Sequence, residues 1–261
     1  STTGVINLTW DEGDEVLIKV GEESAVFTLS SGAGTKTGSF TGVMPGDGSS
    51  YDVVYPADYN EAVLAEQTYV ENGFGKGLMK MSTKTPGTVE GGFTLSADNA
   101  LLGLQLTGND ELGKIVLSNP ADSKTYTLIC TGVKLTSEAK VFYIVVPAGE
   151  WANGFVVDVY ANDNTRIGIL KKASSATFKA STSMAMSTKD VTARYLSICN
   201  GRRLVFSPGN LQYCPMNNEW RFAESQLDYI GEENTMDNFT NPSYDGWLDL
   251  FGWSSENSKF G

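Results

Sequence analysis

The clearest pattern of apolar and polar positions lies between Val141 and Tyr160, where two β-branched and aromatic runs flank a Pro, Gly and Asn connection. The first run is continuous, which predicts a strand covered on both faces. The second run alternates, with Phe155, Val157 and Val159 on one face. Together the runs predict a β-hairpin in a protein core. Because no reactive side chain stands in it, this hairpin predicts a scaffold.

Shorter runs of the same kind recur along the chain. Residues 5–10, 16–20 and 51–55 alternate, so each run should have one buried and one solvated face. Gly, Asp, Asn and Pro turns separate the runs at the spacing of an all-β sandwich. The one helix-like stretch, residues 60–67, is short. Further strand-like runs lie at residues 25–29, 101–106 and 115–117.

Two polar stretches predict three modules. A cluster of Ser, Thr, Lys, Pro and Gly at residues 82–92 indicates a boundary between an N-terminal β-sandwich, residues 1–85, and a second one, residues 86–193. After a second polar stretch, aromatic residues become frequent. We therefore expect a third, aromatic-rich module at residues 194–261.

Charge and composition exclude several functions. The net charge of −12 argues against nucleic acid or an anionic membrane surface as a partner. The chain has no His, so it lacks the base of Ser-His-Asp and Cys-His systems and the imidazole ligands of zinc sites. Cys130, Cys199 and Cys214 show no C-x-x-C spacing. The Cys199 and Cys214 thiols could form a disulfide in an oxidising compartment or stay free. We expect no cofactor, no metal and no catalytic residues.

The aromatic residues of the third module are the one plausible recognition surface. Trp220, Tyr244, Trp247 and Trp253 could stack on sugar rings while nearby carboxylates accept hydrogen bonds from hydroxyls. The same rings could instead form a small core, because the module has few aliphatic residues to bury. We favour the core and keep the ligand site as the alternative.

Two acidic groups are weaker candidates for chemistry. Residues 11–15 hold four carboxylates in a turn, but without the ligand spacing of an EF-hand, so a solvated turn is favoured over a calcium site. Glu224 and Asp228 would share one face if residues 223–230 were helical, which would suit an acid–base pair. Neither group has a recognisable pocket, and a fragment of an enzyme is the least favoured function.

Five blocks in order give residues 1–193 a resemblance to the fimbrillin-like (Mfa-like) surface proteins of Bacteroidetes. The tail from Arg203 resembles a second kind of module in proteins of the same bacteria, whose function does not carry over. In similar proteins that module continues past the point corresponding to Gly261, so the resemblance implies a copy that is cut short. The blocks of the first resemblance are W-D-E-G-D-E-V at residues 10–16, S-F-T-G at 39–42, Y-D-V-V-Y-P at 51–56, A-L-L-G-L-Q-L at 100–106, and the run at 141–160.

The resemblance implies an all-β fold of two tandem transthyretin-like β-sandwiches. It also implies an exported lipoprotein of the cell surface or outer membrane, attached only through a lipid anchor outside this chain. Its partners would be other fimbrial or surface subunits joined by β-strand addition, with host glycans or proteins as further ligands. In polymerising members a protease removes an N-terminal strand after an Arg, whereas the first Arg here is Arg166 and a further module follows residue 193. The resemblance therefore implies a fimbrial tip, an accessory subunit or a non-polymerising surface protein.

Overall fold

The computed structural model describes residues 8–60, 62–121, 124–192, 195–197, 203–205, 209–223 and 241–249. Every regular element in these ranges is a β-strand, which confirms the all-β prediction. The chain divides into two compact units, Ser1–Ala193 and Arg194–Gly261. Each unit is described by itself below.

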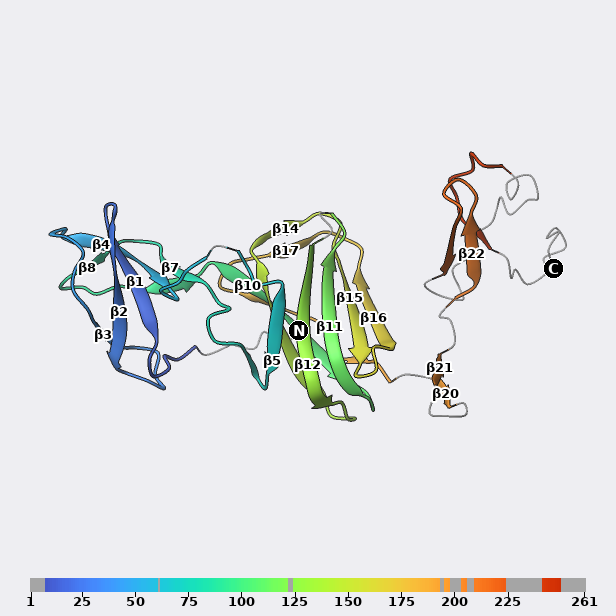
Figure 1. Cartoon of the computed structure of the whole chain (residues 1–261), viewed down its shortest axis with the longest axis horizontal. Helices are drawn as coiled ribbons and strands as arrows, with labels where there is room; N and C mark the ends of the chain where they lie inside the picture. The colour runs from blue at the N-terminus through green and yellow to red at the C-terminus, as the bar shows by residue number, and fades with distance from the viewer. Residues whose placement is uncertain are drawn as a thin grey trace. The chain divides into compact units, whose positions relative to one another are not determined.

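The first strands form one antiparallel sheet in the order β3-β2-β1-β4-β7-β9, with β8 beside β4 (Figure 1). The β1–β2 hairpin turns through Gly21 and Glu22, and Gly21 adopts a φ of 60° that a two-residue hairpin loop favours. The strands are β1 (Glu15–Val20), β2 (Glu23–Ser31), β3 (Ser39–Thr41), β4 (Ser50–Tyr55), β7 (Met81–Thr83), β8 (Gly87–Thr88) and β9 (Leu95–Ala97).

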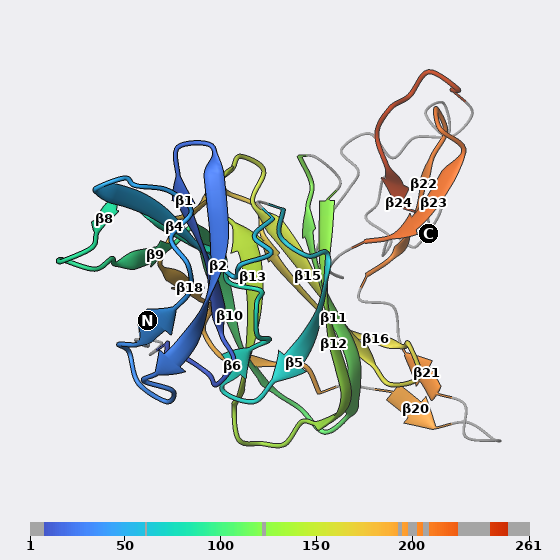
Figure 2. The ribbon, with the colours of Figure 1, turned by 60° about the vertical axis from the view of Figure 1, so that its left-hand side comes forward.

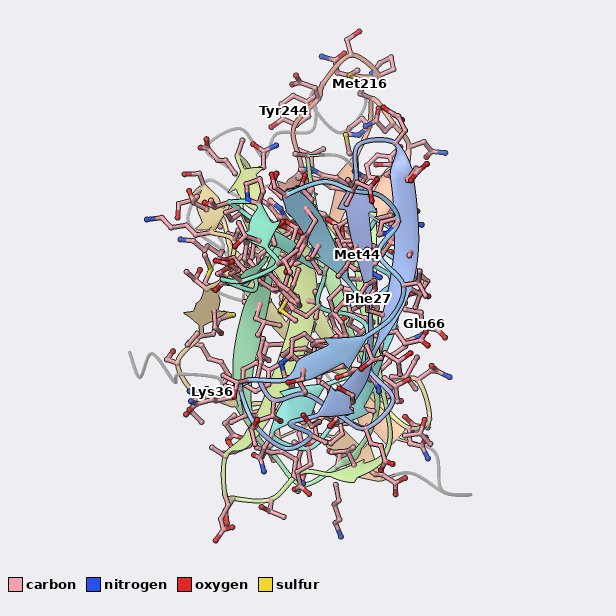
Figure 3. The ribbon with its side chains drawn as sticks, turned by 90° about the vertical axis from the view of Figure 1, so that its left-hand side faces the viewer. Phe27, Lys36, Met44, Glu66, Met216 and Tyr244 are labelled. Atoms are coloured by element: carbon pink, nitrogen blue, oxygen red, sulfur yellow. The ribbon has the colours of Figure 1, made fainter. Side chains whose placement is uncertain are left out.

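One face of this first sheet is buried, as the alternating runs predict. Loop residues cover this face, including Met44, which Figure 3 labels near Phe27 of β2. The rings of Phe40 in β3 and Phe93 just before β9 lie 5.9 Å apart, so the two ends of the sheet approach each other over this core. The buried core residues are Val16, Ile18, Phe27, Tyr51, Val53 and Tyr55.

The second half of this unit is a β-sandwich of two sheets (Figure 2). One sheet has the order β13-β10-β18 with β19 also on β10, and the other has the order β16-β15-β11-β12-β5-β6. The strands of the former are β10 (Asn99–Thr107), β13 (Lys140–Pro147), β18 (Ser183–Ala185) and β19 (Lys189–Asp190). Those of the latter are β5 (Glu66–Val70), β6 (Gly73–Phe74), β11 (Glu111–Asn119), β12 (Lys124–Lys134), β15 (Phe155–Ala161) and β16 (Arg166–Lys172).

The core of the sandwich lies between the inward faces of these two sheets. Leu102, Leu104 and Phe142 face Ile115 and Leu117 in one continuous apolar cluster, and all five are fully buried. Burial of one such side chain stabilises the fold by roughly 1.5–3 kcal/mol. At one end of the core, the short strands β14 (Gly149–Trp151) and β17 (Ala176–Phe178) pair and bring the Trp151 and Phe178 rings to 4.8 Å.

The predicted hairpin at residues 141–160 is wrong in its pairing. Its runs form β13 and β15, but β13 pairs with β10 while β15 pairs with β11 and β16 in the other sheet. The connection crosses between the layers through β14, and Gly154 is needed there. It has a φ of 67°, and a Cβ would stand 1.7 Å from the Lys172 carbonyl oxygen.

The sheets are not divided at residue 85, where the sequence suggested a boundary. β5 and β6, at residues 66–74, belong to the second half of the unit, since β5 pairs in parallel with β12. Conversely, β7, β8 and β9, at residues 81–97, belong to the first sheet. The predicted helix-like stretch at residues 60–67 holds no helix among its described residues and ends in β5.

Asp98 stands where the chain passes from β9 of the first sheet into β10 of the second half. Its carboxylate accepts hydrogen bonds from Tyr59 Oη at 2.9 Å and Ser82 Oγ at 2.8 Å, and it pairs with the Lys84 ammonium. Burial alone would raise the pKa of Asp98, but the hydrogen bonds from Lys84, Ser82 and Tyr59 outweigh it and lower the pKa. The carboxylate therefore ties β7 and the loop after β4 to this junction.

We expect Asp98→Asn to lower the free energy of unfolding by about 1–2 kcal/mol at pH 7, because the charged acceptor is lost. The lowered pKa of Asp98 means that its contribution is present above the usual Asp pKa of about 3.9 and disappears as the pH falls through the folded value. The difference between the variant and the parent protein should therefore shrink toward pH 3. Urea unfolding at both pH values measures it.

The exposed loop residue Asp47 offers a matched control, since Asp47→Asn makes the same chemical change away from the junction. A constant difference between the Asp98→Asn variant and the parent from pH 7 to pH 3 would contradict the assigned role.

In the second unit, β22 (Leu211–Cys214) lies between β23 (Glu219–Phe222) and β24 (Leu248–Asp249) in an antiparallel sheet. A separate two-stranded ladder joins β20 (Tyr195–Ser197) and β21 (Arg203–Val205).

Candidate functional site

Trp220 and Trp247, two of the four aromatic residues expected to form one recognition surface, lie on opposite faces of the small β22–β23–β24 sheet. Trp220 and Phe222 alternate along β23, so they share a face, and their side chains are 55% and 57% exposed. The Tyr213 ring packs against Trp220 with centroids 4.7 Å apart. Arg221, between Trp220 and Phe222, points the other way and places its guanidinium 3.9 Å from the centre of the Trp247 ring.

Tyr244 lies in the loop before β24, and its backbone carbonyl accepts a hydrogen bond from Met216 N at 3.2 Å. Figure 3 labels both residues. Trp253 lies outside the described residues, as do Glu224 and Asp228.

Of the three thiols, Cys130 and Cys214 are buried and free, and Cys199 lies outside the described residues. Burial raises the pKa of the Cys130 thiol to about 12, so this group is a poor nucleophile at neutral pH. Cys130 is thus a core residue of β12.

The acidic turn is a structural anchor as well as a solvated loop. Asp14 is buried, and its carboxylate accepts hydrogen bonds from Tyr55 Oη at 3.0 Å and Asp11 N at 2.7 Å. The Lys76 ammonium lies 2.9 Å from the same carboxylate. Burial and the neighbouring Asp14 charge raise the pKa of Tyr55, so its hydroxyl stays protonated as a donor. Sequence spacing did not distinguish Asp14 from its exposed neighbours.

Among the described residues, no cluster of three or more carboxylates, thiols or imidazoles is placed to hold a metal ion. None of their elements is a helix with the length and apolarity needed to span a bilayer. A groove of about 410 Å³ runs between residues 62–65 and the start of β12, lined in part by Val63, Lys124, Tyr126 and Pro147. It offers no acid–base pair.

Gln67 joins β5 of one sheet to β13 of the other and so closes one side of the sandwich. Gln67 of β5 is 2% exposed, and its side-chain amide bridges to the other sheet. Its Oε1 accepts from Val145 N at 2.9 Å, and its Nε2 donates to the Val145 carbonyl at 2.8 Å. A single side chain therefore supplies what a neighbouring strand would supply at this position.

The two following alternate positions of the β5–β6 hairpin continue this closure. The Tyr69 ring packs 5.1 Å from the Phe142 ring, and Glu71 pairs with Lys140 at 3.6 Å. Gln67, Tyr69 and Glu71 thus meet β13 along most of its length. Nothing in the hydrophobic pattern indicates this contact, because the signal is one Gln in a polar stretch.

Other strand edges have a sheet partner on one side only within the described residues. β3 pairs with β2 at Thr28, Leu29 and Ser31, so residues 23–27 of β2 have β1 as their one strand partner. β16 is the outermost strand of the larger sheet and carries Arg166, Lys171 and Lys172. Charged residues, Lys above all, are a common protection of a sheet edge against unwanted pairing.

Comparison with known proteins yields no matching family model and no matching curated protein. Two solved structures are similar in outline. A proposed cell adhesion protein from Bacteroides fragilis NCTC 9343 aligns over 85% of this chain and 89% of its own, with 11% identity and a TM-score of 0.46. A fimbrial protein from Bacteroides ovatus ATCC 8483 aligns over 80% of this chain and 54% of its own, with 12% identity and a TM-score of 0.41. At TM-scores below 0.5 we infer nothing about function from either protein.

We expect Gln67→Leu to lower the free energy of unfolding by about 2–4 kcal/mol, because Leu fills the space but leaves the Val145 N–H and carbonyl buried without partners. Gln67→Glu should cost less at about pH 4, where a protonated carboxyl can accept from Val145 N and donate to the Val145 carbonyl, than at pH 7, where a buried carboxylate would face that carbonyl. Chemical denaturation gives the stabilities, and amide exchange at Val145 should accelerate in the Leu variant.

Thr68, the exposed neighbour of Gln67, provides the control, because Thr68→Val also removes polarity from β5 but points to solvent. If Gln67→Leu proved as stable as Thr68→Val, the amide bridge would not hold the sandwich closed.

Proposed function

We propose that this chain is a structural and adhesive protein of the bacterial cell surface that associates with other subunits along exposed sheet edges. Its fimbrillin-like motifs support an exported protein, anchored through a lipid outside this chain, in the role of a fimbrial tip or accessory subunit. The observation that carries the proposal is the half-covered strand β2, which presents residues 23–27 with a strand partner on one side only.

The chemistry of this edge favours strand addition. Residues 23–27 contain no Lys, Arg or Pro, in contrast to the cationic edge strand β16. In the β1–β2 register, Glu23 and Val20 flank the two-residue turn and Leu29 N bonds to Asp14 O, so the N–H and carbonyl of Val26 point away from β1. Val26 is 48% exposed, but Gly42 after β3 lies beside its carbonyl, since a Cβ on Gly42 would stand 2.9 Å from the Val26 oxygen. A partner strand that displaces this segment would extend the sheet by main-chain hydrogen bonds.

Substituting Val26→Pro tests this edge, because Pro removes the outward N–H and leaves the β1 hydrogen bonds in place. Val26→Thr is the matched control, since it keeps both the N–H and a β-branched side chain. We expect filaments sheared from producing cells to contain the parent chain and the Val26→Thr variant, and to lack the Val26→Pro variant. Circular dichroism of the purified proteins verifies that each is folded.

Two results would contradict the proposal in different ways. Absence of the parent chain from surface filaments would overturn the fimbrial role. Equal incorporation of the Val26→Pro variant would overturn the use of the β2 edge.

A glycan-binding role for residues 194–261 is the second candidate, and the exposed Trp220 and Phe222 rings favour it. Flat exposed rings on one sheet face suit the apolar face of a sugar. We expect Trp220→Ala and Phe222→Ala to abolish binding on a glycan array, whereas Trp247→Ala, on the opposite face, should retain it. Background signals from the parent chain and all three variants would count against a glycan ligand.

A further inference from the structure

The outer face of the β16-β15-β11-β12 strands mixes apolar residues with polar ones such as Ser118, Thr125 and Thr127, and no other element of the described sheets covers it. In the paired register, side chains that point away from the core alternate with the buried ones. Apolar residues occupy outward positions on all four strands, namely Val116, Ile129, Val156, Tyr160 and Ile169. Antiparallel sheets more often place polar residues on such a face.

Three cations lie among these apolar residues. Lys114 stands over the Tyr160 ring at 5.1 Å, Arg166 pairs with Asp158 at 3.1 Å, and Lys171 lies one row further along. The acidic residues on or beside the face are Asp158, Glu111, which stands opposite Lys134, and Glu66 at the margin on β5. With Lys114, Lys134, Arg166 and Lys171 against these three, the face carries a net charge of +1 on a chain whose net charge is −12.

The acidic charge of the chain is concentrated in its first part. Residues 1–98 hold five Lys and Arg against 14 Asp and Glu, a net charge of −9. Residues 99–193 hold nine against eight and are nearly neutral, with a net charge of +1. The first sheet also has an outward face with an apolar row, in which Val26 is exposed, Leu17 half-buried and Val54 buried, and with Glu15 and Asp52 beside it. Lys19 lies on that face opposite Asp52 in the β1–β4 register.

We propose that the outer face of the β16-β15-β11-β12 strands binds the outer face of the first sheet in a second copy of this chain. The apolar rows of the two sheets would pack face to face, and Lys114 and Lys171 would lie toward Glu15 and Asp52 of the neighbour. This inference rests on the proposed role as an associating surface protein, but it uses sheet faces where strand addition uses edges.

The size of the face sets the strength of the contact. Four strands about 4.8 Å apart and about seven residues long present roughly 400–450 Å². A stable interface needs about 800 Å² from each partner. A single contact should therefore be weak, with a Kd in the micromolar range or above. Because the two faces differ, the contact is heterologous, and repetition produces open chains of copies rather than closed dimers.

Sedimentation velocity of the full 261-residue chain tests the proposal through charge reversal. We expect association that grows with protein concentration and weakens between 50 and 500 mM salt, as screening predicts. The double variant Lys114→Glu, Lys171→Glu should raise the Kd at least about tenfold. The matched control, Lys179→Glu with Lys189→Glu, makes the same charge change at exposed positions outside this face and should leave the Kd within about twofold.

A complementary mixture makes the test specific. The variant Glu15→Lys, Asp52→Lys should also fail to associate alone but should bind the Lys114→Glu, Lys171→Glu variant when the two are mixed. Failure of this mixture, or self-association unaffected by either double reversal, would overturn the face-to-face contact. The Val26→Pro result separates the two ideas, since losing filaments with Val26→Pro while keeping them with both reversals would support strand addition alone.

Discussion

The amide of Gln67 is the contact on which the architecture of the first unit depends. A sandwich with open sides leaves backbone donors and acceptors of its outer strands near the core, where a missing partner is costly. Gln67 satisfies both polar groups of Val145 while its own strand, β5, pairs with β12 of the opposite sheet. One residue thereby joins the two layers. Tyr69 and Glu71 extend the same closure along β13.

This closure also divides the strands between the two halves. Residues 66–74 pair with the second half of the unit, and the core of the first sheet is covered by Phe40 of β3 together with the loop residues Trp10, Met44 and Phe93. The chain then returns through β7 to β9 and passes Asp98 into β10. Each half therefore contains strands from two separate segments of the chain, and the two halves depend on each other.

The sequence predicts the strands of this protein much better than their partners. Alternation identifies which residues of β1, β4 and β15 are buried, since that property is local. Pairing is not local, and the hairpin expected at residues 141–160 fails because a continuous run such as β13 fits any interior position in either layer. Gln67, Asp14 and Asp98 could not be found from the sequence, because their roles depend on distant atoms. The sequence groups Trp220 with Trp247 because both are aromatic. In the structure, Trp220 lies on one face of β23, and Arg221, which contacts Trp247, lies on the other.

The buried polar groups of the first unit already have hydrogen-bond partners within the fold. Each of these groups has a hydrogen-bond partner that is distant in sequence, so each one stabilises the fold. They are Asp14, Gln67 and Asp98. Polar groups engaged in this way are poorly suited to proton transfer, which needs a group free to change partners. The surfaces that we propose for recognition are the β2 edge, the exposed rings of β23 and the outer face of the larger sheet, and they differ in chemistry.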